Sequence, residues 1–185
     1  MRKLLVFNSV TLDGYFTDKN GDMSWAHRQN DPEWSSFTAE NAKSGGELLF
    51  GRVTYDLMAS FWPTPGAASA FPKVAEGMNK APKVVFSKKM EKAEWNNTRV
   101  IKGDLAKEIR KLKEEPGDGL VLMGSGTIIS QIALAGVIDE YQMVVNPIAL
   151  GNGRTMFDGI AGKLNLNLSS TRAFKNGNVL LVYKP

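Results

Sequence analysis

Short apolar runs alternate with segments of helical periodicity along most of the chain. This pattern predicts buried strands at residues 2–10, 46–51, 83–87, 98–101, 119–124 and 139–147. Helices are predicted over 52–61, 70–80 and 104–115, and from Thr127 to about Ala135. Another helix is expected to begin at Pro32, with Asp31 as its N-cap. Residues 11–22 are rich in turn formers, and we expect them to form a loop.

The C-terminal quarter has strand periodicity. One strand is predicted at 164–174, and its alternating Leu164, Leu166 and Leu168 are expected on one face. A second strand is predicted at 178–185. The Asn-Gly step between the two strands favours a hairpin. Because helices separate the earlier strands, residues 1–185 are expected to form one α/β domain, with a mostly parallel sheet and an antiparallel C-terminal hairpin.

Composition narrows the class of protein. The 185 residues are 43% hydrophobic, without a biased tract, as in ordinary globular proteins. Since there is no cysteine and one histidine, disulfides are excluded and a transition-metal site is not expected. The apolar run from Leu4 to Phe7 is too short for a signal peptide, and no stretch approaches the roughly 20 apolar residues of a membrane span. We therefore expect a cytoplasmic protein without membrane contact.

The net charge of +4 is modest, and the basic residues are scattered. The densest group, at 107–115, alternates in sign at helical spacing, which is typical of a solvated helix face rather than a nucleic-acid surface. A mild positive excess also suits an anionic small ligand. The expected partner is therefore a small molecule and not a nucleic acid.

Small residues stand where one predicted strand ends and a helix begins. In sheets of this class, ligands bind beyond the carboxyl ends of the strands. Gly124-Ser125-Gly126 occupies such an end, although Ile129 breaks the G-x-G-x-x-G dinucleotide pattern. Amide donors at a helix N-terminus remain available for an anion, and a tight turn accounts for the glycines equally well.

Two further strand ends carry groups that suit phosphate. Gly51 ends a strand, and Arg52 could hold phosphate together with the amides of Val53 and Thr54. Because an arginine in the first helical turn opposes the helix dipole, a ligand role is indicated more strongly than for an average arginine, and a role without ligand stays an equal alternative. The hydroxyl and ammonium groups at 87–88 suit either a 2′-phosphate or plain solvent.

Five segments, in order and spacing, resemble the dihydrofolate reductase superfamily: residues 8–16, 48–56, 84–88, 120–131 and 136–157. The branch most similar to them is the C-terminal reductase domain of the bifunctional riboflavin biosynthesis deaminase-reductase, and the resemblance spans essentially the whole chain. It implies a three-layer dihydrofolate-reductase-like fold, with NADPH lying across the carboxyl ends of the strands. It also implies a homodimer, for which 136–145 could supply a pairing surface.

The resemblance assigns each strand end to a part of the cofactor. The implied cofactor-binding residues are Gly51, Arg52, Val53 and Thr54 for phosphate, Ser87 and Lys88 for the 2′-phosphate, Gly124, Ser125, Gly126, Thr127 and Ile128 for the pyrophosphate, and Ser9, Gly14 and Phe16, together with Asp13, for the nicotinamide end.

The residues expected near the substrate match the family pattern less closely than those expected near the cofactor. Glu33 stands nearest the acid that dihydrofolate reductases place on their first helix, but the helix dipole also favours a glutamate there. Asp13 either orients its loop as an Asx-turn or faces the nicotinamide and the substrate. Met123 replaces an acid typical of the riboflavin-pathway branch, which argues against that branch's ribosylated pyrimidine substrate. Trp25 either walls the site or packs in the core, and Asn146, Pro147 and the loop at 150–157 match a family stretch near the substrate. The predicted substrate-binding residues are Trp25, Met123 and Asn146.

These residues predict a reductase that moves hydride from NADPH to a C=N, C=C or C=O bond of a small heterocycle, pterin- or pyrimidine-like. The proton would come from water held by Asp13 or Glu33, the predicted catalytic residues. Two alternatives remain open: a module that senses NADP(H) without turnover, and a scaffold that serves an oligomer interface.

Overall fold

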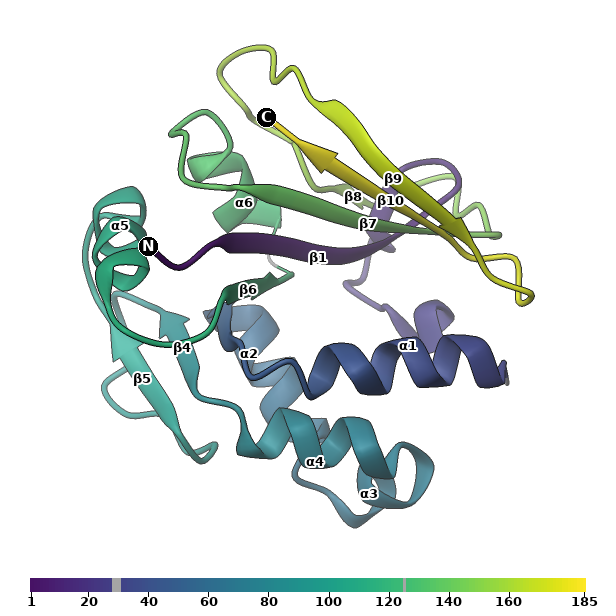
Figure 1. Ribbon diagram of the computed structural model, residues 1–185, viewed down its shortest axis with the longest axis horizontal. Coiled ribbons are helices and arrows are strands. Elements are labelled where there is room, and N and C mark those ends of the chain that lie inside the picture. Colours follow the sequence, from purple (N-terminus) through teal and green to yellow (C-terminus); the bar gives the residue numbers. More distant parts are fainter. Residues whose placement is uncertain (28–30, 125) are drawn as a thin grey trace.

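A single eight-stranded sheet organises the chain in the computed structural model, which describes residues 1–27, 31–124 and 126–185 (Figure 1). The strand order is β5-β4-β3-β6-β1-β7-β10-β9. These strands are β1 (Leu4–Thr11), β3 (Glu47–Gly51), β4 (Lys83–Phe86), β5 (Thr98–Ile101), β6 (Leu120–Met123), β7 (Glu140–Asn146), β9 (Asn167–Ala173) and β10 (Val179–Lys184). A separate two-stranded ribbon pairs β2 (Tyr15–Thr17) with β8 (Arg154–Thr155).

Strand directions confirm the predicted mixture of parallel and antiparallel pairing. Every pair from β5 to β7 is parallel, whereas β10 runs antiparallel to both β7 and β9. The turn of the hairpin contains Gly177 at φ +91°, a conformation that glycine adopts without strain. The carboxyl ends of the parallel strands therefore meet at one edge of the sheet.

The helices are α1 (Pro32–Ala42), α2 (Arg52–Phe61), α3 (Pro65–Ala70), α4 (Pro72–Lys80), α5 (Leu105–Glu114), α6 (Gly126–Ile132) and the 3₁₀ helix η1 (Ser24–His27). The predicted N-cap is confirmed at α1, where the carboxylate of Asp31 accepts a hydrogen bond from the Glu33 amide at 2.9 Å. Asp104 caps α5 in the same way. Within the described ranges, no helix combines the length and apolarity that crossing a bilayer requires.

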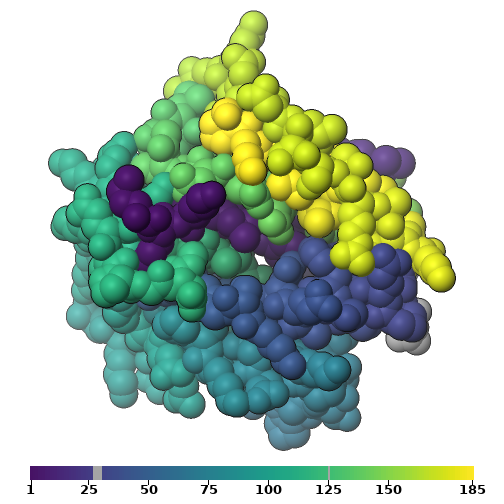
Figure 2. Space-filling view, in the orientation of Figure 1, coloured from purple at the N-terminus to yellow at the C-terminus, as the bar shows by residue number. Residues whose placement is uncertain are grey.

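Buried side chains alternate between the two faces of the sheet, and helices cover both faces, which gives the predicted three layers. On β3, Leu49 points to the side covered by α5 and α6, and Phe50 points to the side covered by α2, α3 and α4. Trp34 and Phe37 of α1 pack against Phe174, so α1 lies against the C-terminal hairpin, as the neighbouring blue and yellow surfaces show (Figure 2).

Some predicted boundaries were wrong. The strand expected at 164–174 begins only at Asn167, and Leu168 is 56% exposed, while Leu164 and Leu166 pack against the core from outside the strand. The helix after Gly126 ends at Ile132, before the predicted end. The sequence did not predict α3, η1, β2 or β8. Each of these four is at most six residues long, so it offers little periodicity.

The packing of α1 against α4 yields a stability prediction at Gly77. Glycine to alanine in an exposed helix normally stabilises by about 0.5–1 kcal/mol, but a Cβ at Gly77 would collide with the backbone carbonyl of Ala42. We expect Gly77→Ala to lower the free energy of unfolding by about 1–3 kcal/mol, measured by urea denaturation. Gly66→Ala in α3 is the control, because its nearest contact there would be an ordinary 3.7 Å. Equal effects of the two substitutions would contradict the prediction.

Candidate functional site

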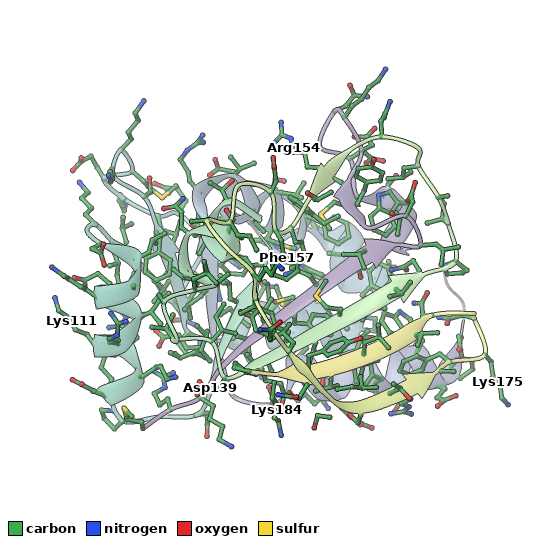
Figure 3. The ribbon with its side chains drawn as sticks, turned by 90° about the horizontal axis from the view of Figure 1, so that it is seen from above. Lys111, Asp139, Arg154, Phe157, Lys175 and Lys184 are labelled. Atoms are coloured by element: carbon green, nitrogen blue, oxygen red, sulfur yellow. The ribbon has the colours of Figure 1, made fainter. Side chains whose placement is uncertain are left out.

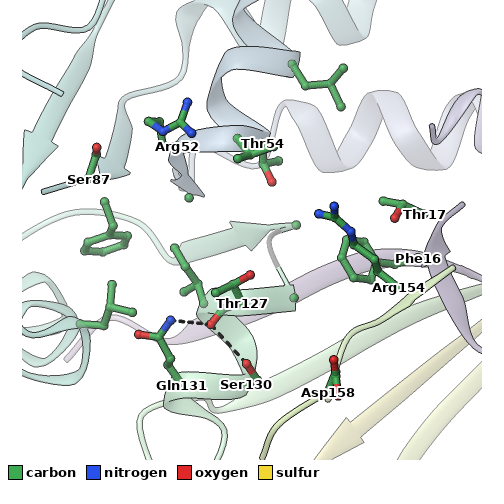
Figure 4. A pocket seen from close by; sticks show the side chains of 18 of the residues that line it. Phe16, Thr17, Arg52, Thr54, Ser87, Thr127, Ser130, Gln131, Arg154 and Asp158 are labelled. Atoms are coloured by element: carbon green, nitrogen blue, oxygen red, sulfur yellow. Dashed lines mark hydrogen bonds between the residues drawn. The ribbon is translucent and has the colours of Figure 1, made fainter. Parts of the chain in front are cut away.

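A cavity of about 710 Å³ opens where the parallel strands end (Figure 4). Its walls come from the segments that follow β3, β4, β5 and β6, and from the β2–β8 ribbon. The lining residues are Phe16, Thr17, Gly21, Met23, Gly51, Arg52, Val53, Thr54, Leu57, Phe86, Ser87, Lys88, Ile101, Gly103, Asp104, Leu105, Gly124, Gly126, Thr127, Ile128, Ser130, Gln131, Arg154, Thr155 and Asp158.

Most residues predicted to bind cofactor line this one cavity. They are Phe16, Gly51, Arg52, Val53, Thr54, Ser87, Lys88, Gly124, Gly126, Thr127 and Ile128. Ser9 and Gly14 do not line it, and Ser125 lies outside the described residues. The three strand ends singled out in the sequence are thus brought together, while the role of each residue stays a prediction.

The start of α2 offers free donors to the cavity. Gly51 is the N-cap in an extended conformation, and no side chain caps the helix. The first amides of α2 therefore lack a side-chain acceptor, and the positive end of the helix dipole faces the lining. The guanidinium of Arg52 pairs with Asp56 at 2.8 Å, and both side chains are about half exposed. Such an exposed pair is weak, so Arg52 is free to exchange partners.

Two glycines let neighbouring segments approach each other closely. Gly124 has φ +75°, and a Cβ there would lie 2.9 Å from the Cγ2 of Thr54. At Gly126 a Cβ would lie 2.8 Å from the ring of Phe16. The sequence suggested that these glycines let a cofactor touch bare backbone or make a tight turn. The structure adds a packing reason, since the missing side chains leave room for Thr54 and Phe16.

The ends of β4 and β5 form the far end of the cavity. The hydroxyl of Ser87 accepts hydrogen bonds from the amides of Lys89 at 3.3 Å and Met90 at 3.1 Å, which stabilises its own turn. Lys88 is exposed on the lining, and Asp104 joins it there while it caps α5. This end thus carries a hydroxyl and both signs of charge.

The opposite wall was predicted only in part, through Phe16 and the loop at 150–157. The β2–β8 ribbon brings Thr17 opposite Arg154 in its register, and both line the cavity. Ser130 and Gln131 also line it and donate hydrogen bonds to the carbonyl of Thr127. Because Ser130 and Gln131 follow Thr127 by three and four residues, helical periodicity could have predicted that all three lie on one face of the helix. The resemblance placed the loop at 150–157 near the substrate, but it did not single out Arg154.

Asp13, predicted to be catalytic, joins two loops outside the cavity lining. Its carboxylate accepts hydrogen bonds from the Thr11 hydroxyl and from the amides of Leu150 at 3.0 Å and Gly151 at 2.7 Å. The Thr11 hydroxyl, followed by the Gly151 amide, lowers the pKa of Asp13 below its ordinary value. The carboxylate therefore organises a loop through the neighbouring Thr11 hydroxyl and through two amides distant in sequence, rather than through an Asx-turn.

Glu33, the other predicted catalytic residue, also lies outside the cavity lining. Its carboxylate pairs with Arg172 of β9 at 2.8 Å. Arg172 also lies over the ring of Phe174, so the pair joins α1 to the C-terminal hairpin. The structure thus gives Glu33 a partner on the sheet edge.

The three predicted substrate-binding residues do not line the cavity either. Trp25 is buried, Met123 packs against the cluster beneath α2, and the amide of Asn146 donates to the carbonyls of Val10 at 3.2 Å and Val144 at 3.1 Å. The burial of Trp25 agrees with the alternative in which this side chain packs in the core. Each of these side chains serves packing or backbone hydrogen bonding in the structure.

Comparison with known sequences gives a family. The model of the RibD C-terminal domain family matches residues 2–180. The chain is also 28% identical over 182 residues to the uncharacterized protein YyaP of Bacillus subtilis (strain 168), covering 98% of this chain and 94% of that protein.

Solved structures share the fold. A putative riboflavin biosynthesis protein from Shewanella sp. PV-4 has a TM-score of 0.75 at 23% identity, with 98% of each chain covered. The deaminase/5-amino-6-(5-phosphoribosylamino)uracil reductase of Thermotoga maritima has a TM-score of 0.70 at 17% identity, with all of this chain and 56% of that one covered. A dihydrofolate reductase from Enterococcus faecalis, complexed with NADP(H), has a TM-score of 0.62 at 14% identity, with 98% and 95% covered. The resemblance seen in the sequence is confirmed, and the chain belongs to the RibD C-terminal domain family.

Proposed function

We propose that this protein is an NADPH-dependent reductase that transfers hydride to a small heterocyclic substrate, pterin- or pyrimidine-like. Its family and its dihydrofolate-reductase-like neighbours support a reductase-type function on a heterocycle. The T. maritima neighbour is named as a 5-amino-6-(5-phosphoribosylamino)uracil reductase, and the E. faecalis neighbour is complexed with NADP(H). The observation that carries the proposal is the cavity, because three predicted phosphate-binding strand ends line it together.

The lining residues fit a phosphorylated dinucleotide. Uncapped amides at the start of α2, with Arg52 beside them, suit a pyrophosphate. Ser87 and Lys88, after the neighbouring strand β4, suit the 2′-phosphate. When bound, NADPH supplies the hydride; the protein supplies orientation and a route for the proton.

The residues of the chain have separate tasks in this proposal. Thr54, Gly124 and Gly126 bring the start of α2, the end of β6 and the ring of Phe16 together, and so shape the middle of the cavity. Because its lowered pKa keeps Asp13 ionised at neutral pH, Asp13 is not itself the acid. We propose water in the cavity as the proton source, and Asp13 as the residue that holds the adjoining loops.

One observation favours the alternative of a non-catalytic NADP(H)-binding module: neither Asp13 nor Glu33 lines the cavity. Incubating the protein with NADPH and panels of oxidised pterins and pyrimidines separates the two functions. Loss of absorbance at the wavelength of reduced nicotinamide with any substrate supports the reductase. Binding without turnover across both panels supports the module. A homodimer also stays a proposal, to be tested by light scattering in solution.

Cofactor binding is tested first at Arg52. We expect Arg52→Gln to raise the dissociation constant for NADPH about 10- to 100-fold, because it removes a charge-assisted hydrogen bond of about 1.5–3 kcal/mol. Tryptophan quenching during titration with NADPH, and then NADH, measures both affinity and preference. Lys80→Gln is the matched control, since Lys80 makes an exposed helical ion pair with Glu76 and does not line the cavity. If wild-type protein binds neither nucleotide at millimolar concentration, the proposal fails.

A further inference from the structure

Three Asn-Gly steps occur in the chain, at residues 20–21, 152–153 and 176–177. In such a step the backbone nitrogen of the glycine can attack the side-chain amide carbon of the asparagine, because glycine has no Cβ to hinder the approach. The attack needs a glycine nitrogen that is free to turn and an asparagine side chain that is free to swing toward it. The structure distinguishes the three steps by these two requirements.

The step at 20–21 is held by a single acidic residue. The side-chain amide of Asn20 donates to Oδ2 of Asp18 at 3.3 Å, and the Asn20 backbone amide donates to Oδ1 at 2.7 Å. The Gly21 amide, which would be the attacking group, donates to the backbone carbonyl of Asp18 at 3.2 Å. Both reacting groups are therefore engaged.

The hairpin step at 176–177 is held as well. Oδ1 of Asn176 accepts a hydrogen bond from the Asn178 amide at 2.9 Å, and the Asn176 amide donates to the Asp31 carboxylate at 3.1 Å. The Gly177 amide donates to the carbonyl of Phe174 at 3.0 Å. An attack here would have to break the hydrogen bonds of the turn.

The step at 152–153 meets both requirements. Asn152 is exposed, and across the ranges that the structure describes, neither its side chain nor the Gly153 amide makes a hydrogen bond. The nearest anchor is the preceding residue, Gly151, whose amide donates to Asp13 at 2.7 Å. Gly151 has φ +76° and open space around it, so the backbone ahead of Asn152 has room to turn.

This step borders the candidate site. Arg154 follows it directly, lines the cavity and is the register partner of Thr17 in the β2–β8 ribbon. Figure 3 shows Arg154 well apart from Lys175, which precedes the hairpin step. The carbonyl of Thr17 occupies the place of a Cβ at Gly153, so the backbone is closely packed against the ribbon here. A longer backbone between residues 152 and 153 would therefore displace the ribbon.

We propose that Asn152 is a site of spontaneous deamidation whose product alters this wall of the cavity. The Gly153 nitrogen forms a bond to Cγ of Asn152, and the side-chain nitrogen leaves as ammonia with the proton of the Gly153 amide. Water then opens the resulting succinimide at either carbonyl, which gives aspartate or isoaspartate. Each product adds a negative charge, and isoaspartate also adds one methylene group to the backbone. The inference goes beyond the proposed function and needs no ligand.

The experiment follows the three steps in the full-length protein during ageing in mildly alkaline buffer. Trypsin places them in separate peptides, residues 20–28, 114–154 and 176–185. Mass spectrometry detects the replacement of NH₂ by OH, labelling by isoaspartyl methyltransferase detects isoaspartate, and an unaged sample corrects for reaction during digestion. We expect Asn152 to react at least about tenfold faster than Asn20 or Asn176, because each of those must first give up its hydrogen bonds.

Two variants test the physical cause and the consequence. Asp18→Ala removes the carboxylate that holds Asn20, so it should speed the reaction at Asn20 and leave the rate at Asn152 unchanged. Asn152→Gln should remove the reaction at its own position. After ageing, wild-type protein should unfold at a lower urea concentration than before, whereas aged Asn152→Gln should unfold where the fresh variant does.

Equal rates at the three steps, or faster reaction at Asn20 or Asn176, would overturn the assignment to Asn152. An unchanged urea midpoint in wild-type protein that contains isoaspartate at residue 152 would overturn the effect on the cavity wall. Because no nucleotide is present in these measurements, a failure of the protein to bind NADPH defeats the proposed function and leaves this inference to be decided by the peptides.

Discussion

Replacing Glu47 by glutamine should lower the free energy of unfolding by about 3–5 kcal/mol, the range expected when one partner of a buried ion pair is removed. The Glu47 carboxylate is buried at the start of β3, with 4% of its side chain exposed. It accepts hydrogen bonds from Arg2 at 2.9 Å and Arg99 at 2.7 Å. Arg2 is itself buried, so the neutral variant leaves a guanidinium without its counter-charge. Urea denaturation followed by circular dichroism measures the loss.

Glu115 provides the matched control for Glu47. It pairs with the same Arg99 at 2.9 Å, but both of these side chains are more than 40% exposed. Glu115→Gln should therefore cost less than about 1 kcal/mol. A loss below 1 kcal/mol for Glu47→Gln would show that the amide satisfies both arginines and that the charge is unimportant.

Gly124→Ala should cost about 2–5 kcal/mol of unfolding free energy and weaken NADPH binding at least about tenfold. At φ +75°, an L side chain is strained by about 1–2 kcal/mol. Its Cβ would also crowd the Cγ2 of Thr54 at 2.9 Å, and overpacking adds about 1–3 kcal/mol. The crowding pushes the start of α2 away from the end of β6, where both line the cavity. Urea denaturation and nucleotide titration measure the two effects.

The two causes can be separated at Gly124. Thr54→Ser deletes the crowding methyl and keeps the hydroxyl, so the double variant should recover the crowding contribution and much of the NADPH affinity. Gly136→Ala is the control for strain alone, because it has φ +64° and open space around the missing Cβ. If Gly124→Ala behaves like Gly136→Ala, crowding by Thr54 is not the cause.

One wall of the cavity was predictable, because its residues directly follow buried strands. An apolar run ends where the chain leaves the core, so Gly51 to Thr54 and Ser87 to Lys88 were placed by position along the chain alone. Parallel pairing then brings these ends to one edge of the sheet. The cavity lining contains these same residues.

The remaining wall and the acidic residues could not be placed in this way. β2 and β8 are three and two residues long, too short for periodicity, and they pair Thr17 with Arg154 across most of the chain. Asp13 and Glu33 were predicted to be catalytic from their places in the family resemblance, and that role stays a prediction. Their partners, Gly151 and Arg172, are 138 and 139 residues away, and no local pattern reveals them.

By itself, the sequence determined the succession of the longer strands and helices along the chain, the parallel sheet with its C-terminal hairpin, and the capping of α1 and α5, because hydrophobic period and capping act over a few residues. Only the tertiary structure decided the environments of charged groups. Lys83, read as the first residue of a strand, is fully buried, and its ammonium donates to the carbonyls of Met78 at 2.8 Å and Ala81 at 2.6 Å. Burial lowers the pKa of Lys83 to about 8. Desolvation and long-range partners set such properties, and both exist only once the chain has folded.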